Sequence, residues 1–172
     1  MDPIVHPLPL SDAGLVLRPF EEQDREPMLR LFSDSRITET YMVPAFQNRQ
    51  EADAFFSRLM ELSRTRFVYG IYLDGTPVGM LNVCGTSGDE MELGYFIDPL
   101  FQGKGLATRA LSLAIQEAFR IGYRLVTAGY FEGNAASRRV MEKCGMEPLD
   151  RESGITWHGI THRCLYMGIS CR

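Results

Sequence analysis

A glycine-rich turn that follows an antiparallel meander is the feature that most limits how this chain can fold. The turn, at residues 102–105, leads into a stretch at 106–119 whose apolar residues recur at helical spacing, and another strand pattern follows at 125–131. A strand, a turn, a helix and a further strand amount to one parallel crossover, which is right-handed. We therefore expect a mixed α/β fold in which a single crossover is joined to an antiparallel meander.

The meander itself is predicted from three apolar runs. Two of them, at 67–73 and 77–83, flank Asp74-Gly75, a dipeptide typical of two-residue hairpin turns, and the third covers 90–97. Because each run is short and turn residues separate them, neighbouring runs should pair in antiparallel fashion.

Further elements are expected on either side of this central part. A first strand at 15–20 is followed by Asp24 as a helix cap, and the segment 33–49 should be a long, partly helical loop before another helix. Asn134 should cap a short helix that ends near Gly145, with two strands after it.

Composition narrows the class of protein. No linker, repeat or low-complexity segment interrupts the chain, so residues 1–172 are expected to form a single domain. No apolar run is long enough to span a bilayer, and the first residues lack the features of a signal peptide, which makes the cytoplasm the expected location. The cysteines show no spacing typical of metal ligands and are interpreted as small buried hydrophobes, so no metal is expected; they are Cys84, Cys144, Cys164 and Cys171.

The charge of the chain is unevenly distributed. Residues 1–101 carry 8 basic and 16 acidic side chains, whereas residues 102–145 carry 7 basic and 3 acidic ones. A local basic region on an acidic protein favours one compact anionic ligand over a nucleic acid, which needs a long basic track. We therefore expect neither a nucleic acid nor a membrane as partner.

The glycine turn predicts a phosphate site. The first turn of a helix has backbone N–H groups without internal partners, the helix dipole adds positive charge, and glycines let a phosphate approach closely. Lys104 and Arg109 add charge nearby.

Two other phosphate motifs fit this string less well. A P-loop would need glycine where Asp98 stands and Ser or Thr where Gly105 stands. The dinucleotide pattern fits Gly103 and Gly105 but ends on Thr108, and its fold needs several successive βαβ units, whereas only one crossover is available here.

The order of these motifs resembles one known family. The string at 102–107 resembles the Q/R-x-x-G-x-G/A signature of the GNAT superfamily of acetyltransferases, and the segments 92–97 and 134–146 resemble its flanking motifs. They are most similar to the subgroup of ribosomal-protein N-terminal acetyltransferases, and the resemblance runs from about residue 15 to 168. It implies a mostly antiparallel, twisted sheet of about six to seven strands with a V-shaped splay between strands 4 and 5, flanked by about four helices.

The resemblance also implies acetyl-CoA as cosubstrate, bound in the splay. Backbone groups of Phe96 and Ile97 would pair with the pantetheine arm, N–H groups of the turn would hold the pyrophosphate, and Asn134 would reach the pantetheine from the other side. Arg138, Arg139 and Lys143 are candidates for the remaining phosphate of CoA, although an exposed charged helix face would also explain them. The cofactor-binding residues implied are Phe96, Ile97, Gln102, Gly103, Lys104, Gly105, Leu106, Ala107, Thr108 and Asn134.

Transfer to an amine needs a base and benefits from a proton donor for the departing thiolate. Glu92 interrupts an apolar strand and is our candidate base; a solvated strand carboxylate is the alternative interpretation. His158 and His162 are weaker candidates for the same task. Many members of the family carry a tyrosine seven residues after the capping asparagine, where this chain has Met141. Ser137, which matches the subgroup's N-x-x-S pattern, is the candidate hydrogen-bond donor to sulfur.

The sequence does not choose the acceptor amine. Contacts to it are expected from the loop at 37–46 and the segment 150–162, because loops on a rigid scaffold carry specificity. The acidic balance of residues 1–101 favours a cationic acceptor, such as a peptide N-terminus, a polyamine or an aminoglycoside-like compound. The alternative function is a CoA-binding sensor of the same fold without catalysis. A monomer and a homodimer are both compatible with the sequence.

Overall fold

One mixed sheet organises the part of the chain that the structure, a computed structural model, describes, which is residues 9–172. Its eight strands follow the order β1-β2-β3-β4-β5-β6-β8-β7. Only β5 and β6 are parallel neighbours; the other described pairs are antiparallel. The strands are β1 (Leu10–Asp12), β2 (Leu15–Arg18), β3 (Val68–Leu73), β4 (Thr76–Ser87), β5 (Glu90–Ile97), β6 (Leu125–Phe131), β7 (Glu147–Trp157) and β8 (Ile160–Ser170).

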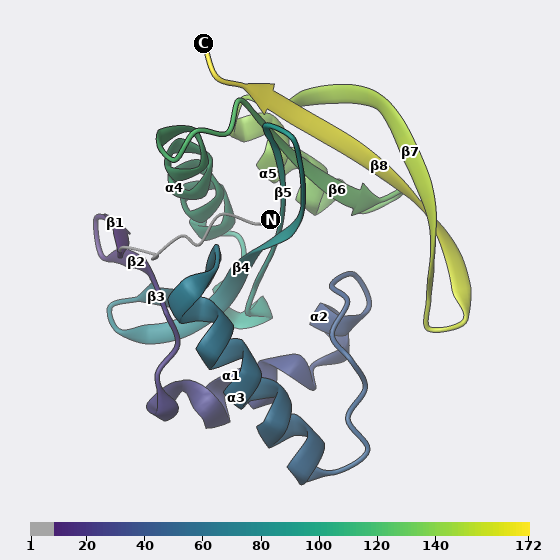
Figure 1. The fold of residues 1–172 in the computed structure, drawn as a ribbon. Coiled ribbons are helices and arrows are strands. Elements are labelled where there is room, and N and C mark those ends of the chain that lie inside the picture. The colour runs from purple at the N-terminus through teal and green to yellow at the C-terminus, as the bar shows by residue number, and fades with distance from the viewer. Residues whose placement is uncertain (1–8) are drawn as a thin grey trace.

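Helices cover both faces of the sheet. On one face lie α1 (Arg25–Phe32), α2 (Ser35–Thr38) and α3 (Arg49–Thr65), and on the other lie α4 (Leu106–Arg120) and α5 (Ala135–Lys143) (Figure 1). Two 3-10 turns, η1 (Glu22–Asp24) and η2 (Pro99–Phe101), precede α1 and α4. Each face has its own apolar core, built around Phe56 on the α1–α3 side and around Leu111 on the α4–α5 side. No helix among residues 9–172 is long and apolar enough to cross a membrane.

The mixed α/β fold predicted from the sequence is confirmed, with eight strands where six to seven were expected and five α-helices where four were expected. The extra strand, β1, has three residues, of which Ser11 and Asp12 are exposed, so the sequence shows no alternating pattern there. The extra helix, α2, is a single turn inside the expected loop at 33–49. The hairpin turn lies where it was expected, with Asp74 at φ 48° and Gly75 at φ 82°, which suits a type I′ turn.

Two local predictions at the N-terminal end were wrong. The first strand ends at Arg18 rather than residue 20, and proline follows it, which has no N–H to offer a strand partner. Asp24 precedes α1 but does not cap it with its side chain. Its buried carboxylate instead accepts hydrogen bonds from the backbone N–H of Glu21 at 2.8 Å and the hydroxyl of Tyr72 at 2.7 Å.

The parallel strands β5 and β6 separate part-way along their length. They pair from Glu90↔Leu125 to Glu92↔Thr127 and no further, although β5 remains paired with β4 and β6 remains paired with β8. The two strands therefore open like a V, with the backbone of each still held on its outer side. This is the splay implied by the resemblance, and it determines where a ligand can enter the sheet.

Candidate functional site

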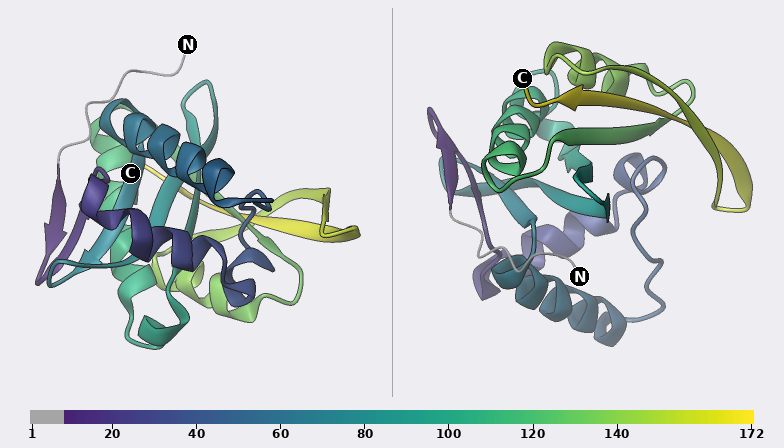
Figure 2. Two further views of the ribbon diagram at one scale, coloured as in Figure 1. Left: turned by 90° about the horizontal axis from the view of Figure 1, so that it is seen from below. Right: turned by 45° about the horizontal axis from the view of Figure 1, so that its top comes forward.

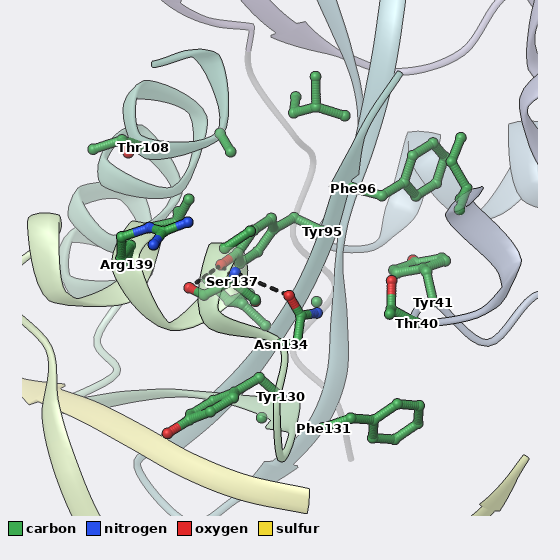
Figure 3. Close-up of a pocket in the computed structure, with 18 of the residues that line it drawn as sticks. Thr40, Tyr41, Tyr95, Phe96, Thr108, Tyr130, Phe131, Asn134, Ser137 and Arg139 are labelled. Carbon is green, nitrogen blue, oxygen red and sulfur yellow. Dashed lines mark hydrogen bonds between the residues drawn. The ribbon is translucent and has the colours of Figure 1, made fainter. Parts of the chain in front are cut away.

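A cavity of about 710 Å³ lies at the splay between β5 and β6. Its walls come from β5 and β6, from the turn before α4, from the first turn of α5, from the α2 region and from β8. Figure 3 shows Ser137, Asn134 and Tyr95 gathered on one side of this space and Tyr41 and Thr40 on another. The predicted site residues that line the cavity are Glu92, Phe96, Ile97, Gln102, Gly103, Gly105, Leu106, Ala107, Thr108, Asn134 and Ser137.

The glycine turn presents the uncapped start of α4 to this cavity. Gly103 and Gly105 both have φ of +75°, a left-handed conformation that favours glycine. Gly105 is the N-cap and offers no side chain to the helix, whose hydrogen bonding begins with the N–H of Arg109 donating to the carbonyl of Gly105. The earlier N–H groups of the first turn, at residues 106–108, are thus left for a ligand, and an anion is the ligand they favour.

Buried contacts hold the segment that leads into this turn. Asp98 is fully buried, accepts from the backbone N–H of Leu100 at 2.9 Å and pairs with Arg30 of α1 at 3.0 Å. The side-chain amide of Gln102 donates to the carbonyl oxygen of Ile97 at 3.1 Å. These contacts tie the end of β5 to α1 and to the turn that precedes α4.

The basic side chains near the turn do not all face the cavity. Lys104 does not line it; its ammonium group lies 5.1 Å from the centre of the Phe101 ring. Arg109 forms an ion pair with Asp12 of β1 at 2.8 Å and does not line the cavity either, so the expectation that it adds charge to the turn is wrong.

On α5, the candidates for the remaining phosphate divide in the same way. Arg139 and Lys143 line the cavity, whereas Arg138 pairs with Glu142 at 2.8 Å along the helix. An anion in the cavity would therefore meet the charges of Arg139 and Lys143.

The backbone of β5 faces the gap at alternate residues. Where β5 ends, the backbone N–H of Asp98 donates to the carbonyl oxygen of Val78, which precedes the residues of β4 that pair with β5. Because backbone groups along a strand face alternate sides, the N–H and carbonyl of Phe96 also face β4. The groups that face the gap are those of Tyr95 and Ile97. The backbone contact expected for Phe96 therefore moves to Tyr95, while Ile97 keeps its N–H free to pair with a ligand there.

The first turn of α5 carries a small hydroxyl network. The side-chain oxygen of Asn134 accepts from the backbone N–H of Ser137 at 3.2 Å, which is the helix cap expected from the sequence. The Ser137 hydroxyl lies 3.1 Å from the hydroxyl of Tyr95 on β5. Burial raises the pKa of Tyr95 to about 12, so its phenol stays protonated at neutral pH.

Glu92 lies on the opposite face of β5 from Tyr95 and is partly buried. Burial raises the pKa of its carboxyl group, Arg151 opposes this, and the neighbouring charge of Glu90 adds to it. For Glu90 burial alone would raise the pKa, but hydrogen bonds from Arg151 at 2.7 Å and Thr127 at 2.9 Å lower it. Of these two carboxyl groups, Glu92 is therefore the one better suited to accept a proton.

The two histidines proposed as weaker bases do not line the cavity. The Nε2 atom of His158 lies 3.0 Å from the carbonyl oxygen of Thr38, and the His162 ring stacks on Phe131 with 4.4 Å between ring centres. His158 sits at the turn between β7 and β8, so this contact brings the hairpin tip onto the α2 region. The two segments expected to contact an acceptor thus lie together.

The interpretation of the cysteines was only partly right. Cys164 is buried, whereas Cys84 and Cys171 are exposed and Cys144 is half-buried. Cys84 and Cys164 both line the cavity. A Cβ atom at Gly94 would lie 2.7 Å from the sulfur of Cys84. Glycine at position 94 therefore leaves room for the Cys84 thiol.

Sequence reasoning missed several residues of this site. The clearest are Tyr95, which looks like one more apolar residue of β5, and the pair Tyr41 and Asn82, whose side-chain hydrogen bond joins the loop after α2 to β4. The alternation of β5 places Tyr95 on the same face as Leu93 and Ile97, and that signal could have separated it from Glu92. No signal in the sequence brings Tyr41 to Asn82.

Comparisons with known proteins agree with this geometry. A family model described as "Acetyltransferase (GNAT) domain" matches residues 14–147. A probable N-acetyltransferase of Bacillus subtilis, YjcK, is 27% identical over 149 residues, which cover 79% of this chain and 82% of that protein.

Solved structures of similar fold span nearly the whole chain. An acetyltransferase (GNAT family) from Bacillus anthracis superposes with a TM-score of 0.82 at 22% identity, covering 95% of this chain and 98% of the other. RimL, a ribosomal L7/L12 alpha-N-protein acetyltransferase solved in complex with coenzyme A, superposes with a TM-score of 0.79 at 17% identity and the same coverage.

Proposed function

The chain belongs to the acetyltransferase (GNAT) family and is an acyltransferase, and on this premise we propose that it transfers the acetyl group of acetyl-CoA to a primary amine. The amine attacks the thioester directly while both substrates are bound. No acetylated enzyme is formed, so no nucleophilic cysteine is needed.

The observation that carries the proposal is the splay of β5 and β6 with the uncapped start of α4 at its edge. The pyrophosphate lies on the N–H groups of residues 106–108, where the helix dipole favours negative charge. The pantetheine arm runs into the gap and pairs with the backbone groups of Tyr95 and with the N–H of Ile97. RimL, which shares the fold, was solved with coenzyme A bound, and this supports a CoA ligand here.

The two sides of β5 divide the chemistry. A primary amine with a pKa near 8–10 is mostly protonated at neutral pH and must lose a proton before it attacks. Glu92 accepts that proton, directly or through a water molecule, and its raised pKa makes it a better base than an exposed carboxylate. Ser137, which lies across the strand, donates a hydrogen bond to the sulfur as the carbon–sulfur bond breaks.

The acceptor enters the cavity from the side of α2 and the β7–β8 hairpin. Thr40 and Tyr41 line the cavity from one segment and Ile155 from the other. Glu92 lines the cavity and would attract a cationic acceptor such as a peptide N-terminus, a polyamine or an aminoglycoside-like compound. The name of RimL, an alpha-N-protein acetyltransferase, supports the first of these.

The proposal is tested in two steps with one sample. Calorimetric titration measures binding of acetyl-CoA, with NAD and ATP as controls, and release of the CoA thiol is then followed with a panel of peptides, polyamines and aminoglycosides. We expect acetyl-CoA alone to bind and at least one amine to be acetylated in preference to its acidic analogues. Binding without turnover of any amine would favour the sensor function, and failure of a folded sample to bind acetyl-CoA would contradict the proposal altogether.

A further inference from the structure

The hydroxyl group of Tyr95 meets Ser137 from the opposite wall of the splay. Tyr95 belongs to β5 and Ser137 to the first turn of α5, and their hydroxyl oxygens lie 3.1 Å apart (Figure 3). The Tyr95 hydroxyl also donates to the backbone carbonyl oxygen of Ser137, in a longer contact of 3.3 Å. The contact therefore connects β5 to α5 across the cavity, beyond the point where β5 and β6 stop pairing.

We propose that Tyr95 is a positioning residue for Ser137: the tyrosine donates a hydrogen bond to the serine oxygen and so directs the serine proton toward the sulfur of CoA. The inference rests on the proposed function, and it adds a role that the family motif does not assign to Tyr95.

The proposed direction rests on the shorter of the two contacts of the phenol, 3.1 Å to the serine oxygen against 3.3 Å to the carbonyl, and on the inventory of each group. A serine hydroxyl has one proton and can turn freely, and in the first turn of a helix it competes for nearby backbone carbonyls. A phenol has one proton on a rigid ring, and the pKa of Tyr95 is raised to about 12 by burial, so this proton is present at neutral pH. When Tyr95 donates to Ser137, the serine oxygen is an acceptor there and its own proton is left for the cavity.

The rest of α5 supplies no substitute for this pair at the same place. Met141 stands where many members of the family carry a tyrosine, and it is 1% exposed within the apolar core. Its thioether has no proton to donate. A hydrogen bond to the departing sulfur on this side of the gap is therefore assigned to Ser137, held in place by Tyr95.

The chemical step balances without a proton leaving Tyr95. The amine nitrogen forms a bond to the carbonyl carbon, the carbon–sulfur bond breaks, and its electron pair goes to sulfur. Glu92 takes the first proton from the ammonium group before attack and passes it to water, and it takes the second proton as the amide forms. The CoA thiolate leaves while accepting the hydrogen bond from Ser137, and water returns a proton to it after release.

The test uses the folded protein with CoA itself as the probe. The ultraviolet absorbance of the thiolate is titrated in the complex with wild type, Tyr95→Phe, Ser137→Ala and the double variant. Tyr69→Phe is the control, because this residue is a buried tyrosine on β3 that does not line the cavity. We expect both single variants to raise the pKa of the bound thiol to the same extent, and the double variant to raise it no further.

Turnover gives an independent measurement. We expect Tyr95→Phe to lower kcat about tenfold, as Ser137→Ala does, with the KM for acetyl-CoA unchanged within about twofold. Tyr69→Phe should match wild type. If Tyr95→Phe shows the same thiol pKa and the same kcat as wild type, the inference is overturned while the proposed function stands. A loss of acetyl-CoA affinity without a change in the pKa of the bound thiol would also overturn it. Failure of folded wild type to bind CoA would overturn the proposed function with it.

Discussion

The indole N–H of Trp157 donates to the carbonyl oxygen of Thr38 at 2.6 Å, which ties the end of β7 to the last residue of α2. His158 reaches the same oxygen at 3.0 Å. The β7–β8 hairpin projects beyond the rest of the sheet (Figure 2). The two contacts to Thr38 hold the tip of this hairpin against α2. The tip and α2 are therefore held together on the side of the cavity where the acceptor is proposed to enter, and they should move together.

We expect Trp157→Phe to raise the KM for the acceptor about fivefold and to leave the KM for acetyl-CoA unchanged. The variant keeps an aromatic ring but removes a hydrogen bond worth about 1 kcal/mol, so the hairpin tip loses one of its two contacts to Thr38. Steady-state kinetics with each substrate varied in turn measures both values. Thr161→Val is the matched control, because Thr161 bonds to Thr156 within the same tip and does not contact α2. Equal changes in both KM values would argue against a separate acceptor wall.

Gly105→Ala should weaken acetyl-CoA binding by about tenfold or more. Alanine at φ +75° costs about 1 kcal/mol of stability, and its methyl group adds bulk to the turn at which the pyrophosphate is proposed to lie. Gly75→Ala is the matched control, since Gly75 has φ +82°, an equally open Cβ position and a place in a hairpin turn far along the sheet. Calorimetric titration and thermal unfolding of both variants separate the two effects.

We expect Gly105→Ala and Gly75→Ala to lose similar stability, and only Gly105→Ala to lose affinity for acetyl-CoA. If both variants bind acetyl-CoA like wild type, the phosphate is not held at the start of α4.

The sequence predicted the elements whose signals are local. The Asp74-Gly75 turn needs positive φ at both residues, the helical stripe of α4 is long, and Asn134 caps α5 through its own side chain, so each was placed from a few neighbouring residues. The strand β1 was not predicted, because three residues are too few to show an alternation of apolar and polar side chains.

The details that were missed depend on contacts between distant parts of the chain. Asp24 looks like a helix cap, but its carboxylate is buried against Tyr72, which lies 48 residues further on. Arg109 follows the glycine turn in the sequence, yet its guanidinium group reaches back to Asp12. A side chain's neighbours in sequence determine where its backbone lies, and the tertiary packing determines which partner its charged end finds.

Two buried tyrosines of β3 should respond in opposite ways to loss of the hydroxyl group. The hydroxyl of Tyr69 is buried without a hydrogen-bond partner among the described residues, whereas that of Tyr72 donates to the buried carboxylate of Asp24 at 2.7 Å. Tyr69→Phe removes an unsatisfied polar group and should raise the free energy of unfolding by about 1 kcal/mol, whereas Tyr72→Phe should lower it by about 1.5–3 kcal/mol. Denaturant titration of both variants measures the difference, and destabilisation of equal size would show that Tyr69 has a partner in solution.

Glu92→Gln should lower kcat by about 100-fold and remove the acidic limb of the pH profile. Burial raises the pKa of Glu92, so in wild type kcat/KM should fall as pH drops through a value above the ordinary carboxyl range of about 4.3, where the base becomes protonated. The profile of the variant should lack this limb, because glutamine does not titrate. A limb that persists unchanged would assign the base to another group.

The same substitution should stabilise the protein at neutral pH. A carboxyl group whose pKa is raised by folding binds its proton more tightly in the folded state, so wild type loses stability as pH rises from the ordinary carboxyl range through the raised pKa of Glu92. Glutamine avoids the burial of this charge, and the Tm of Glu92→Gln should therefore exceed that of wild type at pH 7, with the difference vanishing near pH 4. Thermal unfolding across this range measures the difference. Glu90→Gln is the control, since hydrogen bonds from Arg151 and Thr127 lower the pKa of Glu90, and its loss should reduce Tm at pH 7. An increase in Tm for both variants would mean that general charge repulsion at this end of β5, rather than the burial of Glu92, sets the stability.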